Sequence, residues 1–262
     1  MKLTSIMWGS YAPVLKRAAP AAGIECSIYP ARVLEESADR IEEALAAMRV
    51  SDVILVYHTS DLFWERVDKE LAVLKKTIPV ISLGPDPSYW AHSTVSPELV
   101  TTCHRYITNN GDENFKNMLL CIRKEIFGDN VAVAPPAFLP WEGLYHPDAP
   151  TAFSSVNEYR EWYANRVPGG PRVALIFSRT SWAAGNVGLE DMLIRHLEAE
   201  GMNVLPVFTY AIADDSLGAK GMAQVVNEYL LEDGVPLVDA MVKLIPFLFG
   251  SVRDNASKST AA

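Results

Sequence analysis

Short apolar runs alternate with helix-patterned stretches along the first part of the chain. The runs are typical of strands buried on both faces of a parallel sheet. The predicted strands are residues 2–8, 25–29, 52–57 and 78–83. The predicted helices between them are residues 11–23, 37–48 and 61–76. Such alternation predicts right-handed crossovers and a doubly wound parallel sheet of the flavodoxin-like or Rossmann-like class.

A further helix at 114–127 and a short strand at 130–134 complete this first α/β domain, which we expect to span residues 1–134. A stretch dense in proline follows at 135–150. Proline has no amide donor and restricts the residue before it, so regular structure is not expected there. The stretch also carries aromatic side chains, which indicates an extended linker packed on a protein surface.

The connector as a whole is expected to span residues 135–171, with one helix near 156–165 and a Pro-Gly-Gly-Pro turn at its end. Strand-helix alternation then begins again in a second unit, residues 172–250. Its predicted strands are 172–177, 203–209 and 237–244, and its predicted helices are 188–200 and 222–231. This is half of a doubly wound sheet, either a small lobe in its own right or part of a longer polypeptide. The polar tail, 251–262, is expected to be disordered.

Composition narrows the function classes. Hydrophobic residues make up 49% of the chain and charged residues 21%, as in a globular protein with a substantial core. The net charge of -9 argues against a nucleic-acid partner, which requires clustered lysine and arginine. The sequence lacks a signal peptide pattern and an apolar run long enough for a membrane span, so a cytoplasmic location is expected. The cysteines are widely spaced and predict neither disulfides nor a thiolate metal site.

In the first unit, polar and aromatic residues follow the predicted strands at their carboxyl ends, where α/β proteins bind ligands. The candidate substrate-binding residues there are Trp8, Ser10, His58 and Ser60. Aromatic faces beside hydroxyls and a histidine suit a flat ligand with polar edges. The alternative is structural: Trp8 and His58 would cover the core, and Ser60 or Asp61 would cap the next helix.

In the second unit, the equivalent candidates are Arg179, Ser181, Trp182 and Asn186. Arginine offers a planar fork for a carboxylate and tryptophan offers a stacking face. The loop lacks the Lys-Ser/Thr ending of a phosphate loop and the GxGxxG dinucleotide pattern. Arg179 and Trp182 could equally dock the two domains or the missing remainder of a longer polypeptide. Neither the spacing of a zinc-binding helix nor a GxSxG elbow occurs, so no metal ligand and no catalytic residue is assigned.

Three segments resemble a known family: PWEGLYHP at 140–147, FSRTSWAAGN at 177–186 and NVLPVF at 203–208. In order and spacing they are similar to the N-terminal region of the large subunit of cobaltochelatase and magnesium chelatase, with the likeness covering most of residues 135–250. The resemblance implies a subunit that binds a tetrapyrrole for insertion of Co²⁺ or Mg²⁺ in biosynthesis of the cobalamin or chlorophyll type. It also implies AAA+ partner subunits that hydrolyse ATP, and the remainder of the large subunit as a further partner.

Family members are several times longer than this chain, and the residues that hold their metal and macrocycle lie beyond the matched region. We therefore expect this chain to bind no cofactor itself and to be inactive alone. The alternative function is a freestanding flavodoxin-like module that binds a ligand or a protein without enzymatic activity. A small-molecule enzyme that uses His58 is a third reading.

Overall fold

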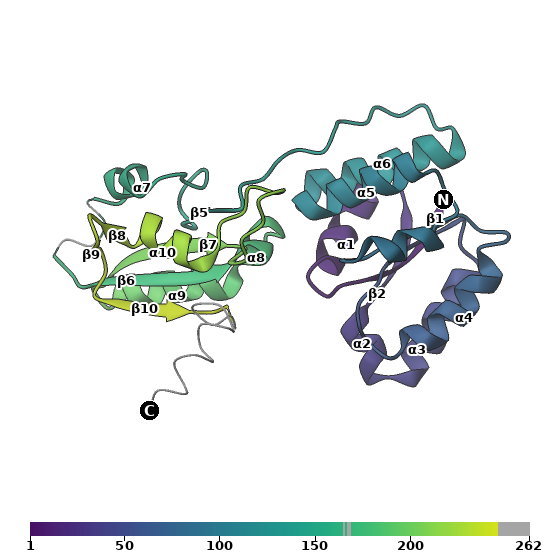
Figure 1. Cartoon of the computed structure of the whole chain (residues 1–262), viewed down its shortest axis with the longest axis horizontal. Helices are drawn as coiled ribbons and strands as arrows, with labels where there is room; N and C mark the ends of the chain where they lie inside the picture. The colour runs from purple at the N-terminus through teal and green to yellow at the C-terminus, as the bar shows by residue number, and fades with distance from the viewer. Residues whose placement is uncertain (165, 167–168, 246–262) are drawn as a thin grey trace. The chain divides into compact units, whose positions relative to one another are not determined.

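The computed structural model describes residues 1–164, 166 and 169–245. The chain divides into two compact units, Met1–Leu139 and Pro140–Ala262, which are described separately below (Figure 1). The expected tail at 251–262 lies outside the described residues.

The first unit contains a four-stranded, fully parallel sheet with the strand order β2-β1-β3-β4. Its strands are β1 (Lys2–Met7), β2 (Glu25–Pro30), β3 (Val53–Tyr57) and β4 (Val80–Leu83). The order reverses direction at β1, as in flavodoxin-like folds, so the prediction of a doubly wound parallel sheet is confirmed. The loops that follow β1 and β3 leave neighbouring strands at the same edge of the sheet.

Helices cover both faces of this sheet (Figure 1). They are α1 (Ala12–Ala21), α2 (Ala31–Glu36), α3 (Ala38–Arg49), α4 (Trp64–Leu74), the 3-10 helix η1 (Pro87–His92), α5 (Pro97–Asn109) and α6 (Asp112–Phe127). Helices α2, α3 and α4 share one core with alternate strand residues such as Ile6, Ile54 and Val56. Helix α6 packs against both α1 and α5 and contributes to a separate layer. This division follows from the alternation of side chains along each strand.

The strand predicted at 130–134 does not form. The backbone groups of Ala134 bond to side chains and not to a strand. Its N–H donates to Asn117 Oδ1 at 2.9 Å, and its carbonyl oxygen accepts from the Tyr106 hydroxyl at 2.5 Å. Side chains of α5 and α6 therefore satisfy the groups that a neighbouring strand would have bonded.

The second unit has a sheet with the order β10-β6-β7-β5. Its strands are β5 (Glu142–Leu144), β6 (Arg172–Ser178), β7 (Asn203–Thr209) and β10 (Ala240–Lys243), and a small hairpin is formed by β8 (Leu231–Glu232) and β9 (Val235–Pro236). The parallel strands β10, β6 and β7 confirm the predicted half sheet. Helices α7 (Val156–Tyr163) and α10 (Met222–Tyr229) share one core, while α9 (Gly188–Ala199) contributes Ile194 to another.

Two local expectations for this unit were wrong. Within the proline-rich stretch, Glu142–Leu144 forms a strand antiparallel to β7, because the prolines stand outside it and Phe208 and Val207 offer a free edge. The expected polar loop after β6 begins as a short helix, α8 (Arg179–Ala183). Ser178 explains this helix, because its side chain accepts a hydrogen bond from Thr180 N and caps the first turn.

We expect Gly143→Ala to destabilise the second unit by about 2 kcal/mol through overpacking. A β-carbon at Gly143 would lie 2.8 Å from Phe208 Cζ and 2.9 Å from the Phe153 carbonyl oxygen, so β5 would have to shift. Urea unfolding followed by tryptophan fluorescence measures the change. The matched control is Gly188→Ala, where nothing lies within 4 Å, and its expected effect is within about 0.5 kcal/mol. Equal effects of the two variants would contradict the observed packing of β5.

Candidate functional site

In the first unit, the loop after β1 packs against the end of β3 through aromatic contacts. The Trp8 ring packs edge-on against Tyr11 at 5.8 Å, and Tyr11 packs edge-on against Tyr57 at 5.3 Å. Trp8 is nevertheless 52% exposed, so much of its indole remains accessible. The Ser10 hydroxyl oxygen is buried and has no hydrogen-bond partner among the described residues. The structure thus places Trp8 and Ser10 just after β1, with the indole accessible and the Ser10 hydroxyl oxygen buried.

His58 directly follows β3 and is only 1% exposed. Its Nε2 is 3.0 Å from Asp68 Oδ1, and its Nδ1 is 3.2 Å from the Ser82 hydroxyl oxygen. The imidazole is stacked between Trp64, at 4.0 Å, and Tyr89, at 4.7 Å. These contacts lock the ring in place and make His58 an anchor for the loop that carries Ser60.

The order Asp68, His58, Ser82 resembles a hydrolytic triad in its residue types. The geometry does not support nucleophilic catalysis, because Ser82 is fully buried and its hydroxyl donates to the Tyr89 carbonyl oxygen at 2.8 Å. A nucleophile must instead be exposed to a substrate and paired with a general base. Burial therefore separates this cluster from any bound substrate in the described conformation.

The expected capping role of Ser60 or Asp61 was wrong. Helix α4 begins later, with Phe63 at the N-cap and no side-chain cap. The Asp61 carboxylate instead accepts a hydrogen bond from the Thr59 hydroxyl at 2.5 Å. Ser60 is exposed at the tip of the loop, on the carboxyl side of β3.

In the second unit, Arg179 is only 3% exposed. Its Nε donates to the Pro140 carbonyl oxygen at 3.0 Å, and its guanidinium carbon lies 3.9 Å from the centre of the Trp141 ring. A guanidinium over an indole face forms a favourable cation–π contact. Arg179 therefore fastens the segment that enters β5 to the carboxyl edge of β6.

The other candidates of the second unit differ in how far they are exposed to solvent. Trp182 is half-buried and its ring stacks on Phe208, with centroids 4.0 Å apart and planes 7° apart. Ser181 is half-buried, and its carbonyl accepts a hydrogen bond from Asn186 N at 2.9 Å. Asn186 is exposed. The accessible polar groups are thus those of the loop, while the arginine is committed to protein contacts.

A buried acid, Glu190, stands in the first turn of α9, close in sequence to this loop. Glu190 is only 6% exposed. Burial, above all, raises the pKa of the Glu190 carboxyl. Asp191 is also engaged, because its carboxylate accepts a hydrogen bond from the Tyr145 hydroxyl at 2.9 Å. The only sequence signal for the burial of Glu190 was its position beside the apolar residues of α9.

Elsewhere in the second unit, His146 is buried between charged groups. Its Nε2 is 3.0 Å from Glu198 Oε1. Two residues along the chain, the Asp148 carboxylate accepts hydrogen bonds from the guanidinium groups of Arg166 and Arg195. Burial is the largest influence and lowers the pKa of His146, against the opposing effect of Glu198. This network joins the segment after β5 to α9.

Among the residues described, no group of three or more histidine, cysteine, aspartate or glutamate side chains is arranged to hold a metal ion. Over the same part of the chain, no helix combines the length and apolar character required to cross a membrane.

The motif-bearing segments around this anchor match a known family. The family model described as CobN/Magnesium Chelatase matches residues 104–262. The chain belongs to this family. The resemblance noted at 140–147, 177–186 and 203–208 is thereby confirmed, and the chain corresponds to an N-terminal region of the chelatase large subunit.

The relatives that this chain matches are much longer, and the chain spans less than a fifth of each one named here. An uncharacterized protein of Methanocaldococcus jannaschii, MJ1441, is 29% identical over 98% of this chain and 19% of its own length. A magnesium-chelatase subunit of Chlorobaculum parvum is 32% identical over 57% of this chain and 11% of its own. The catalytic subunit of cobaltochelatase from Mycobacterium tuberculosis has the same fold, with a TM-score of 0.54 and 17% identity, over 93% of this chain and 18% of that one.

We expect Arg179→Met to lower the free energy of unfolding of the second unit by about 2 kcal/mol, because the Pro140 carbonyl and the Trp141 face lose their cationic partner. Arg179→Lys should recover only part of this, since an ammonium lacks the planar fork. Urea unfolding measures both variants. The control, Arg32→Met, removes an exposed arginine and should change stability by less than about 0.5 kcal/mol. An Arg179→Met variant with the same free energy of unfolding as the wild type would contradict this anchoring role.

The lowered pKa of His146 predicts a loss of stability at mildly acidic pH. The unfolded chain takes up a proton near the ordinary histidine value of about 6.5, whereas the folded protein does so at lower pH. Stability is therefore full above about pH 6.5 and falls as the pH drops toward the lowered value. His146→Gln should lose less of its melting temperature than the wild type between about pH 7.5 and about pH 5.5. The exposed His196→Gln should behave like the wild type.

Proposed function

We propose that this chain is the N-terminal part of a class I metal chelatase large subunit that binds a tetrapyrrole for ATP-dependent insertion of Co²⁺ or Mg²⁺. The family match over residues 104–262 carries the proposal. A relative named as a magnesium-chelatase subunit and a solved structure titled as a cobaltochelatase catalytic subunit support it. Because the chain spans less than a fifth of either protein, we assign metal insertion to the complete large subunit acting with AAA+ partner subunits.

The first unit offers the better contact for a macrocycle. A tetrapyrrole has a broad flat face and polar substituents at its edge, so it calls for an accessible aromatic surface beside hydrogen-bonding groups. Trp8 supplies an indole that is more than half exposed. The Ser10 hydroxyl oxygen has no partner among the described residues, but it is buried and offers no contact at the surface. The exposed Ser60 lies at the end of β3, the strand next to β1. We assign the macrocycle face to Trp8 and its polar edge to the exposed Ser60.

His58 and Arg179 have a different role in this proposal. Each is buried and bonded to neighbouring protein groups, so each holds a loop in shape and leaves ligand contact to other residues. In the second unit, Ser181, Trp182 and Asn186 are the remaining candidates for contact with substrate or with the rest of the large subunit. Trp182 stacks on Phe208 and is half-buried, so we assign the exposed part of its ring to such a contact.

Tryptophan fluorescence during titration with coproporphyrin tests the proposal. We expect quenching, and we expect Trp8→Ala to weaken binding by about tenfold, the order expected from one lost aromatic stack. The melting temperature should change little, because the indole is mainly exposed. Phe127→Ala is the matched control, since Phe127 is 42% exposed at the end of α6 and outside these loops.

The same titration distinguishes the alternatives. Binding that is equal in Trp8→Ala, Phe127→Ala and the wild type would remove the assigned contact. Absence of quenching up to the solubility limit of the porphyrin would contradict tetrapyrrole binding and favour a freestanding interaction module. Insertion of Co²⁺ by the isolated chain would contradict the assignment of chelation to the complete subunit.

A further inference from the structure

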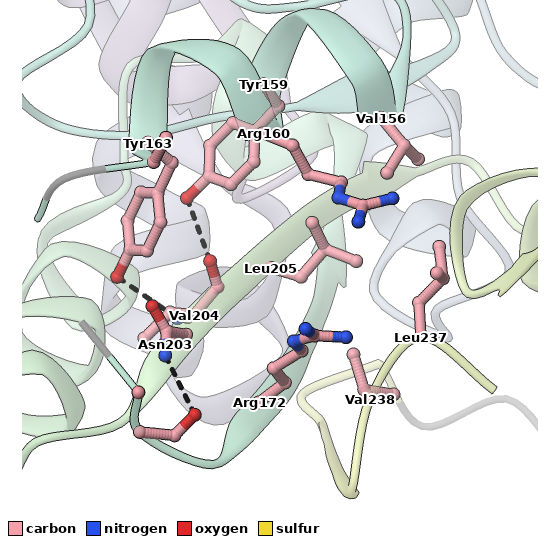
Figure 2. A pocket seen from close by; sticks show the side chains of 13 residues that line it. Val156, Tyr159, Arg160, Tyr163, Arg172, Asn203, Val204, Leu205, Leu237 and Val238 are labelled. Atoms are coloured by element: carbon pink, nitrogen blue, oxygen red, sulfur yellow. Dashed lines mark hydrogen bonds between the residues drawn. The ribbon is translucent and has the colours of Figure 1, made fainter. Parts of the chain in front are cut away.

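The second unit contains a cavity of about 320 Å³ at the edge of its sheet opposite to Arg179 and Trp182 (Figure 2). Arg172 and Asn203, the first residues of β6 and β7, lie on its wall, together with residues of α7. The cavity is thus formed at the amino ends of the parallel strands. It shares no lining residue with the loops considered above for the tetrapyrrole.

Apolar side chains form much of the cavity wall. They are Val156, Leu205, Leu237 and Val238. The stacked rings of two tyrosines, with centroids 5.2 Å apart, complete the wall. Hydrogen bonds between their hydroxyls and the sheet hold the rings in this position. Tyr159 donates to the Val204 carbonyl oxygen at 2.9 Å, and Tyr163 accepts from Val204 N at 3.1 Å. The wall therefore suits an apolar ligand body.

Two cationic groups interrupt this apolar wall. Figure 2 shows the guanidinium groups of Arg160 and Arg172 beside the cavity, with Leu205 between them. Glu232 lies near Arg160, but the contact between Nη1 and Oε1 is long, at 3.4 Å, and both side chains are largely exposed. The Asp239 carboxylate accepts a hydrogen bond from the backbone N–H of Arg172 at 2.8 Å. Two arginines at one apolar cavity stand out in a chain with a net charge of -9.

The rim of the cavity is built closely against the sheet. A β-carbon at Gly170 would lie 1.9 Å from the Gly201 carbonyl oxygen, so only glycine fits between these backbones. Asn203 Nδ2 donates to the Gly170 carbonyl oxygen at 2.9 Å and holds the same segment. This part of the cavity is therefore formed before a ligand arrives, which lowers the entropic cost of binding.

We propose that this cavity is a binding site for a small carboxylate that has a flat or branched apolar body. Arginine pairs with a carboxylate through two parallel hydrogen bonds, and the apolar wall removes the ligand body from water. A volume near 320 Å³ is at the small end of the range for ligand pockets, about 300–1,000 Å³. The inference is independent of tetrapyrrole binding, which involves the opposite ends of the strands.

Titration of the full chain with 2-naphthoate, followed by ¹H–¹⁵N NMR, tests the site. We expect the amide shifts to concentrate at Gly169, Gly170, Leu237 and Val238. Arg172→Gln should weaken binding by about tenfold, as should replacement of the probe by uncharged 2-naphthamide. Val238→Trp should block the cavity. Arg32→Gln, which removes an exposed arginine of the first unit, is the matched control and should bind like the wild type.

Three results would overturn the inference. They are equal affinity for naphthoate and naphthamide, equal weakening by Arg172→Gln and Arg32→Gln, and shifts that map to residues away from the cavity. Absence of any shift up to about 10 mM naphthoate, beyond the range of weak fragment binding, would also overturn it. None of these results depends on porphyrin quenching or on Trp8, so this inference and the proposed function can fail separately.

Discussion

Parallel pairing of a central strand with both of its neighbours is the constraint on which each unit depends. In the first unit β1 pairs with β2 and β3, and in the second β6 pairs with β7 and β10. Parallel strands require crossover helices, which cover the faces of the sheet. The amino and carboxyl ends of the strands therefore remain available for binding. In the second unit this pairing runs from Arg172 opposite Asn203 to Ser178 opposite Thr209. One register therefore positions both the amino-end cavity and the carboxyl-end loop.

Polar side chains at the carboxyl edges fall into two physical classes. Some are buried and bonded, as Arg179 is to Pro140 and His58 is to Asp68. Removing such groups from water is favourable only when protein partners replace the lost hydration, so their surroundings are specific and rigid. Others, such as Ser60 and Asn186, remain accessible on the loops that the first class holds. A ligand surface is built most precisely when these two roles are divided in this way.

Much of the fold was predictable because the central strands are buried on both faces and read as continuous apolar runs. Val53–Tyr57, with every residue buried, is the plainest case. The missed strand Glu142–Leu144 has no such run, because it is short and lies antiparallel at a sheet edge. The expected strand at 130–134 failed for the opposite reason. Its local pattern was suitable, but Asn117 and Tyr106 occupied the backbone groups of Ala134.

The sequence by itself determined the α/β class, the two tandem units and the family. These properties follow from local apolar periodicity and short motifs, which survive without knowledge of long-range contacts. Only the tertiary structure decided which candidates are accessible, that Glu190 is buried, and that Arg160 and Arg172 share one cavity. Burial and pairing between residues distant in the chain depend on strand register and helix packing, and no local pattern encodes them.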